Sequence, residues 1–213
     1  MGLFSATAPA PAPARQSDRT ESLASLHVSP LEKKTTEQKG KLVFEDEASF
    51  RQDSTLYRTW SRVGQQPLVP VTGARQSAKI FGCVEVYDAT FVYGSDEVFN
   101  GHTYVDFLET KMAPRFYRPG QRVIYIHDNA SYHKEQEVQA WFATHCKWLE
   151  VEPLPAYSPE FNAAEPLWHH TRVQGTHNRC FKSRQEILDS LHHVFRGMQR
   201  HPESISGYLR PFR

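Results

Sequence analysis

The order in which strand and helix patterns follow one another constrains the fold of this chain most. In the first part of the chain, the apolar residues follow strand patterns. In the second part, segments with helical spacing alternate with short apolar runs. Such an order predicts a mixed α/β sheet with helices packed on it. We expect strands over residues 42–44, 56–60, 79–87, 90–93, 122–127 and 148–151, and helices over residues 102–112, 134–145 and 185–198.

The first forty residues differ in composition from the rest of the chain. They contain an Ala-Pro repeat over residues 8–14, many Ser, Thr and Gln residues, and Phe4 as their single aromatic residue. Such a segment buries too little apolar area to offset the entropy lost on ordering. We therefore expect a disordered Pro/Ala/Ser-rich tail over residues 1–40 and one folded domain over residues 41–213.

Hydropathy and cysteine content indicate the compartment. No apolar run approaches the roughly 18 residues that a membrane-spanning helix needs. The three cysteines are far apart and form no C-x-x-C pair, which argues against a disulfide framework and against a structural zinc site made of cysteines. We expect a protein of a reducing compartment, the cytoplasm, without membrane association.

Charge is distributed unevenly along the chain. Residues 41–165 hold 12 Lys and Arg against 17 Asp and Glu, whereas residues 166–213 hold 8 against 3. An acidic body followed by a basic end suits a cation site beside a surface for a polyanion. The simpler interpretation is uneven solvated charge. The same two interpretations apply to the candidate phosphate-binding residues Arg172, Arg179, Lys182 and Arg184.

Three carboxylates stand where elements are expected to begin or end. Asp46 and Asp128 each follow an apolar run, and Glu165 stands at the start of an expected helix. Ligands gather at strand ends in open α/β sheets, and Mg²⁺ prefers oxygen ligands. Three carboxylates can hold two ions about 4 Å apart for phosphoryl transfer, with Asp46 bridging them. Taken singly, each acid is also a common cap or turn residue.

Several longer motifs are more specific than these acids alone. They are FEDEASF at residues 44–50, HDNASYH at 127–133, LPAYSPEFNAAEPLW at 154–168 and THNRCFKS at 176–183. Together they resemble the catalytic domain of mariner-like transposases, most closely the bacterial insertion-sequence-630 branch. The resemblance covers roughly residues 41–200 and implies a ribonuclease H-like fold.

The resemblance also implies a function. It implies a catalytic, metal-binding triad of Asp46, Asp128 and Glu165 with two Mg²⁺ or Mn²⁺ ions. It implies cleavage of double-stranded DNA at transposon ends, and strand transfer by the freed 3′-hydroxyl into target DNA, typically at TA. A homodimer and association with the nucleoid of a bacterial cell are expected by the same analogy.

Two further residues of the HDNASYH motif are candidates for a supporting role. Asn129 and His133 are expected to support the metal site or to contact substrate phosphate, or else to be a turn amide and a helix-start imidazole. Glu47 is left out of the triad, because alternate strand residues point to opposite faces of a sheet. Trp168 is expected in the core.

Two departures from the family pattern leave alternatives open. The usual N-terminal helix-turn-helix part has no counterpart in residues 1–40, which suggests a separate DNA-binding chain or a truncated copy. Pro166 follows Glu165, whereas the family commonly has proline before the glutamate, and this order could displace the carboxylate. The alternatives are a catalytically impaired remnant that binds DNA or full-length transposase, and a general nuclease for RNA–DNA hybrids.

Overall fold

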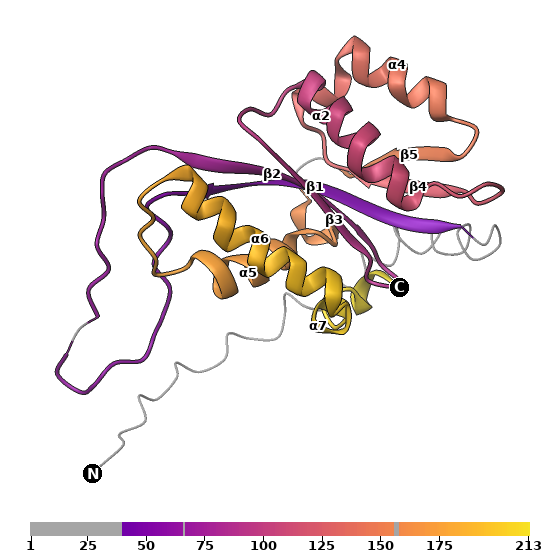
Figure 1. Ribbon diagram of the computed structural model, residues 1–213. Helices are drawn as coiled ribbons and strands as arrows, with labels where there is room; N and C mark the ends of the chain where they lie inside the picture. The colour runs from indigo at the N-terminus through magenta and orange to yellow at the C-terminus, as the bar shows by residue number, and fades with distance from the viewer. Residues whose placement is uncertain (1–39, 66, 156–157) are drawn as a thin grey trace.

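A computed structural model describes residues 40–213 apart from residues 66, 156 and 157, so nearly all of the expected tail lies outside the described residues. One five-stranded sheet runs through the domain in the order β3-β2-β1-β4-β5 (Figure 1). β1 pairs antiparallel with β2 and parallel with β4, which makes the sheet mixed. The strands are β1 Lys41–Arg51, β2 Ser77–Glu85, β3 Phe91–Asp96, β4 Val123–His127 and β5 Leu149–Pro153.

Helices cover both faces of this sheet. α2 and α4 lie on one face, and α5, α6 and α7 lie on the other (Figure 1). The helices are α2 Gly101–Phe107, α3 Ala113–Phe116, α4 Gln136–His145, α5 Glu165–Thr171, α6 Arg184–Arg200 and α7 Glu203–Ser206. π-helical turns follow α2 (η1 Leu108–Met112) and α5 (η4 Arg172–Thr176), and short 3₁₀ turns are η2 Ser131–Lys134, η3 Pro159–Phe161 and η5 Arg210–Phe212.

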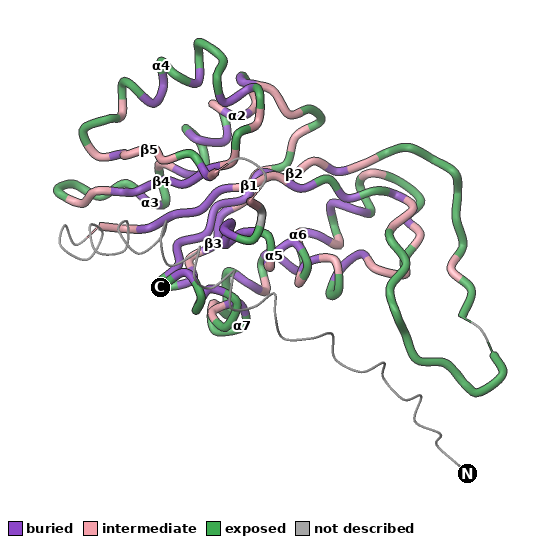
Figure 2. Tube along the Cα trace, turned by 180° about the vertical axis from the view of Figure 1, so that it is seen from behind, coloured by how far each residue is buried: buried purple, intermediate pink, exposed green. Residues whose placement is uncertain are grey.

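The alternation of side chains along β1 separates two hydrophobic cores. Phe44 and Ala48 belong to the core under α5 and α6, whereas Val43 belongs to the core under α2 and α4. Both cores exclude solvent, as the buried stretches of the central strands in Figure 2 show. Asp46 therefore projects toward the α5 side, and Glu45 and Glu47 project toward the α2 side.

Most of the expected elements are confirmed, because their local signals agree with their tertiary surroundings. The hairpin of β2 and β3 turns at Asp88 and Ala89, and Ala89 takes a positive φ of 57°. α6 begins after Ser183, whose side chain accepts a hydrogen bond from the backbone of Glu186. Apolar residues at helical spacing bury one face of α6 against the sheet.

Two expectations about the first strands are wrong. Residues 56–60 form no strand, because Leu56 and Trp60 lie in an exposed segment, 72% and 90% accessible, and no strand of the described residues pairs with it. Asp46 does not follow β1 but lies in its middle, because β1 continues to Arg51 by pairing with β2. The expected strand end near Glu45 is instead the point where β1 loses β4 as a partner.

Within the described part of the chain, no helix combines the length and the hydrophobicity that crossing a membrane requires.

Candidate active site

The site lies where β1 and β4 separate. Their parallel register ends with Phe44 opposite Ile126, so the next residues on the same face are Asp46 and Asp128. Beyond Phe44 that edge of β1 is free of β4, which leaves space beside Asp46. The carboxylate oxygens of Asp46, Glu47 and Asp128 lie within 4.8 Å of one another. The register of two parallel strands thus brings together acids that are 82 positions apart.

Asp46 is held by a tryptophan from the opposite layer. Nε1 of Trp168 in α5 donates a hydrogen bond of 2.9 Å to Oδ2 of Asp46. Gly82, opposite Asp46 on β2, makes room for the indole, since a Cβ there would lie 2.9 Å from Cζ2 of Trp168 and closer still to Cη2. Burial, and then the charge of Glu47, raise the pKa of Asp46 to about 7. The indole hydrogen bond opposes this rise.

Asp128 sits in a turn that its own side chain closes. Its Oδ1 accepts a hydrogen bond of 2.8 Å from the backbone of Ala130. The neighbouring Asn129 donates from Nδ2 to the carbonyl oxygen of Leu154, 2.6 Å away, and so ties this turn to the segment after β5. The Asp128 side chain is 43% exposed, so one side of the cluster faces solvent.

Glu165 is the first residue of α5, and Pro166 is the second. The missing N–H of Pro166 therefore costs the helix no hydrogen bond. Asn162 starts the turn, accepting from the backbone of Ala164 at its side chain and from that of Glu165 at its carbonyl. The cap residue of α5 is Ala164.

The Glu165 carboxylate lies outside the cluster that Asp46, Glu47 and Asp128 form. It is exposed, and its charge contributes to the raised pKa of Asp46. Among the described residues, it belongs to no group of three ligand residues whose donor atoms all lie within 4.8 Å of one another.

Glu47 is the residue that sequence reasoning missed. Its backbone orientation is the one expected, but its carboxylate lies beside those of Asp46 and Asp128. Burial, and then the charge of Asp128, raise its pKa to about 8. The sequence signal that could have indicated Glu47 is its place next to Asp46 on a strand. The long Glu47 side chain can reach around the edge of β1, because β4 no longer pairs with β1 there.

His133 approaches the same region from η2. Its Nδ1 lies 3.0 Å from the carbonyl oxygen of Asp128, and its Nε2 lies 3.4 Å from Oε1 of Glu47. Burial lowers the pKa of His133, which favours the neutral imidazole. His133 thus contacts both the β4 turn and β1.

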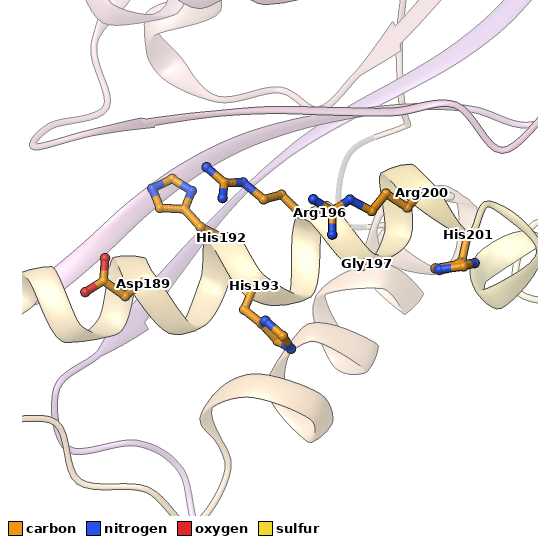
Figure 3. Close-up of a pocket in the computed structure, with 7 residues that line it drawn as sticks. All are labelled: Asp189, His192, His193, Arg196, Gly197, Arg200 and His201. Carbon is orange, nitrogen blue, oxygen red and sulfur yellow. The ribbon is translucent and has the colours of Figure 1, made fainter.

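The four basic candidates lie in different environments. Arg179 and Arg184 bind within the protein, to Ser190 and to the carbonyl oxygen of Asp96. Arg172 lies over the ring of Phe50, and Lys182 is exposed. A basic surface separate from these four residues lies along α6, where a hollow of about 500 Å³ is lined mainly by histidine and arginine (Figure 3). Its lining is Asp189, His192, His193, Arg196, Gly197, Arg200 and His201.

The acidic cluster fits a hard divalent cation. Asp46, Glu47 and Asp128 offer oxygen donors only, close together and partly open to solvent. Without a cation, carboxylates so close repel one another, as the raised pKa values of Asp46 and Glu47 indicate. Oxygen donors in this number are what Mg²⁺ and Mn²⁺ require from a protein.

These pKa values predict how stability depends on pH when no divalent cation is present. The pKa of Asp46 is about 7 in the folded chain against an ordinary 3.8, so between these values the folded state binds more protons. The free energy of unfolding should therefore fall as pH rises from 4 to 7, by up to about 1.4 kcal/mol per pH unit for one such carboxyl. The measurement is urea unfolding in EDTA at several pH values.

Two comparisons make this pH experiment specific. Asp46→Asn should have a smaller slope than the parent chain, whereas Asp106→Asn, at an exposed position of α2, should match the parent. Added Mg²⁺ should stabilise the parent more at pH 8 than at pH 5, because cations displace protons from carboxylates. A parent slope that Asp46→Asn leaves unchanged would contradict the assigned environment of Asp46.

Comparison with solved structures identifies the fold. The Mos1 strand transfer complex matches all of this chain and 62% of its own, at 17% identity and a TM-score of 0.63. The Mos1 mariner paired end complex with Mn matches 100% of this chain and 63% of its own, at 20% identity and a TM-score of 0.63. The catalytic domain of Mos1 mariner transposase matches 97% and 91%, at 19% identity and a TM-score of 0.53. The expected ribonuclease H-like mixed sheet flanked by helices is thereby confirmed.

The family follows from the sequence. Residues 41–188 match the DDE superfamily endonuclease family, and the chain belongs to it. The Transposable element Tcb2 transposase of Caenorhabditis briggsae is 25% identical to this chain over 163 residues. That match covers 70% of this chain and 59% of the relative, so the chain corresponds to only part of that longer protein.

Proposed function

We propose that this domain is the catalytic domain of a mariner-like DNA transposase, of the insertion-sequence-630 branch. It would cleave double-stranded DNA at transposon ends and join the freed 3′-hydroxyl to target DNA, typically at TA. The observation that carries the proposal is the convergence of Asp46 and Asp128 in a chain of the DDE endonuclease family. The similarity to a transposase from Caenorhabditis briggsae supports the same conclusion.

Asp46, Asp128 and Glu165 are the proposed catalytic residues. Asp46 and Asp128 would hold Mg²⁺ or Mn²⁺, with Glu47 beside them, and Glu165 would complete the set from α5 when DNA is bound. Two bound ions would activate the attacking oxygen and stabilise the leaving oxygen of an in-line phosphoryl transfer.

The protein's own contribution is to hold these carboxylates in place. Trp168 fixes the orientation of Asp46 through its indole N–H, and Asn129 fixes the turn that carries Asp128. His133 supports both strands from the buried side. Near-attack geometry tolerates displacements of only about 1 Å, so these supports matter for rate.

Basic surfaces near the domain's C-terminal half are proposed to contact DNA phosphates. Arg172 and Lys182 are available, and the hollow on α6 adds imidazole and guanidinium groups. Such contacts carry affinity without reading base sequence. Residues 41–213 would form this domain, which would work as a homodimer on nucleoid DNA, with end recognition by a separate helix-turn-helix segment or chain.

The impaired-remnant alternative is weakened only in part, because Pro166 leaves α5 intact while the Glu165 carboxylate lies outside the acidic cluster. Pro166 occupies the second position of α5, where it costs the helix nothing. The alternative now depends on whether Glu165 joins the site when DNA is bound, and on whether the chain works without the remaining length of its relatives.

A substrate panel tests the proposal against a general nuclease. With Mn²⁺, we expect nicking of supercoiled plasmid and, with a pre-cut transposon-end duplex, joining of its 3′-hydroxyl to plasmid. An RNA–DNA hybrid of the same sequence should be cut more slowly than the duplex DNA. Preferential cutting of the hybrid, without any joining, would contradict the transposase assignment.

A further inference from the structure

A second group of potential metal ligands lies on the inner face of β1. Glu45, Glu47 and His133 bring one carboxylate oxygen each and one imidazole nitrogen within 4.8 Å of one another. They lie on the α2 side of β1, whereas Asp46 projects toward α5. The Glu45 side chain is fully buried, that of His133 is 2% exposed and that of Glu47 is 9% exposed. This group is therefore enclosed within the core under α2 and α4.

Burying these polar groups costs free energy unless a hydrogen-bond partner or a bound ion compensates for the lost water. Oε1 of Glu45, Oε1 of Glu47 and Nε2 of His133 form no hydrogen bond within the described part of the chain. Each buried polar atom left in this way keeps the free-energy cost of its lost hydration. Among the described residues, the Glu45 carboxylate accepts one hydrogen bond, from the hydroxyl of Tyr104, 3.2 Å from Oε2. One carboxyl hydrogen bond does not compensate for three enclosed polar atoms.

The orientation of His133 is that of a metal ligand. Its Nδ1 lies 3.0 Å from the carbonyl oxygen of Asp128 and 2.9 Å from Nδ1 of His127, so a proton on Nδ1 has an acceptor within hydrogen-bond distance. In the neutral ring, Nε2 then presents its lone pair toward Glu47 and Glu45. Metal-bound histidines are commonly oriented in this way, with the other ring nitrogen donating to a backbone carbonyl.

The distances between donor atoms agree with a small metal ion. Nε2 of His133 lies 3.4 Å from Oε1 of Glu47 and 3.9 Å from Oε2 of Glu45. Ligands at about 2.1 Å around a tetrahedral ion are about 3.4 Å apart. A set of one imidazole and two carboxylates suits Zn²⁺ or Mn²⁺, whereas Mg²⁺ rarely takes nitrogen ligands.

We propose that Glu45, Glu47 and His133 form a buried site for a divalent transition metal ion, Zn²⁺ or Mn²⁺, distinct from the Asp46–Asp128 site. Its ion would satisfy Oε1 of Glu47 and Nε2 of His133, would bind the Glu45 carboxylate, and would connect β1 to the turn after β4. Glu47 lies next to both sites, so the solvent-facing side of the acidic cluster is the route of entry. The site does not depend on the domain acting as a transposase.

The test measures bound metal rather than activity. The full chain is loaded with Zn²⁺, dialysed against excess Mg²⁺, and analysed for metal by mass spectrometry. We expect about one Zn²⁺ for each chain, since tight structural zinc resists exchange for Mg²⁺. His133→Gln and Glu45→Gln should each lose the ion. Electron paramagnetic resonance should detect a nitrogen ligand in the Mn²⁺-loaded parent chain but not in His133→Gln.

Two controls distinguish this site from its neighbour and from the surface. His102→Gln removes an imidazole that is 87% exposed and should retain the ion. Asp128→Asn should also retain it, because the backbone carbonyl near His133 is unchanged and asparagine keeps an oxygen acceptor in place of Oδ1, which lies 3.4 Å from Nδ1 of His133. Should His133→Gln fail to fold, Glu45→Gln, which keeps the shape of the side chain, decides the question alone. The proposal is overturned if the parent retains no Zn²⁺, if a folded Glu45→Gln variant retains it, or if Asp128→Asn loses it.

Discussion

Asp128→Asn should reduce plasmid nicking in Mn²⁺ by more than about 100-fold. Substitution of a residue that only supports a metal ligand already lowers activity by up to about 100-fold, and Asp128 is itself a proposed ligand. Asparagine keeps the shape of the side chain and its acceptor for Ala130, so the turn after β4 should persist. What it removes is the charge that, together with Asp46, would hold the cation. The measurement is the initial rate of conversion of supercoiled to open-circular plasmid.

The matched control for this experiment is Asp106→Asn. Asp106 lies on the exposed side of α2, away from the acidic cluster, and its variant should nick at the rate of the parent chain. Equal nicking by the parent and by Asp128→Asn would contradict the proposed site. No nicking by either chain would favour the catalytically impaired alternative, provided that both are folded.

Trp168→Ala should lower the free energy of unfolding by about 3–5 kcal/mol, the usual cost of removing a large buried aromatic side chain. Trp168 is 1% exposed and packs edge-on against Phe50, Phe91 and Phe195, which belong to three different elements. No side chain at Gly82 can fill the resulting space. Urea unfolding followed by circular dichroism in the far ultraviolet measures the loss.

Trp168→Phe separates packing from the hydrogen bond to Asp46. Phenylalanine keeps an aromatic ring but has no N–H, so it should cost less stability than alanine while leaving Asp46 without its indole donor. We expect slower nicking by Trp168→Phe than by the parent chain. Trp60→Ala, at a position 90% exposed, should change stability by less than about 0.5 kcal/mol. A comparable loss in Trp60→Ala and Trp168→Ala would contradict the assigned core.

Local patterns predicted the elements whose signals are strong over several residues. The hairpin of β2 and β3, the strand that becomes β4 and the amphipathic α6 were all expected, because periodicity and turn residues operate within the element. Residues 56–60 have strand-forming residue types but no strand to pair with. Strand propensity reflects how well side chains pack against a neighbouring strand. Where no such strand lies alongside, the propensity predicts a strand that does not form.

The candidate site was predicted less completely than the fold. The motifs around Asp46, Asp128 and Glu165 named three acids, and the structure brings Asp46 and Asp128 together. Glu47 was excluded by strand periodicity, which describes the direction of Cβ but not the reach of a long side chain. Glu165 is the first residue of α5, as expected, but its carboxylate lies outside the acidic cluster.

The sequence by itself determined where most of the strands and helices lie and that Glu165 begins a helix, because these properties depend on neighbours a few residues away. Only the tertiary structure decided that β4 pairs with β1 in the register that brings Asp128 beside Asp46. It also decided that Glu45 is enclosed in the core under α2 with His133. Register and burial are set by packing between segments distant in the chain, and no local pattern in either segment encodes them.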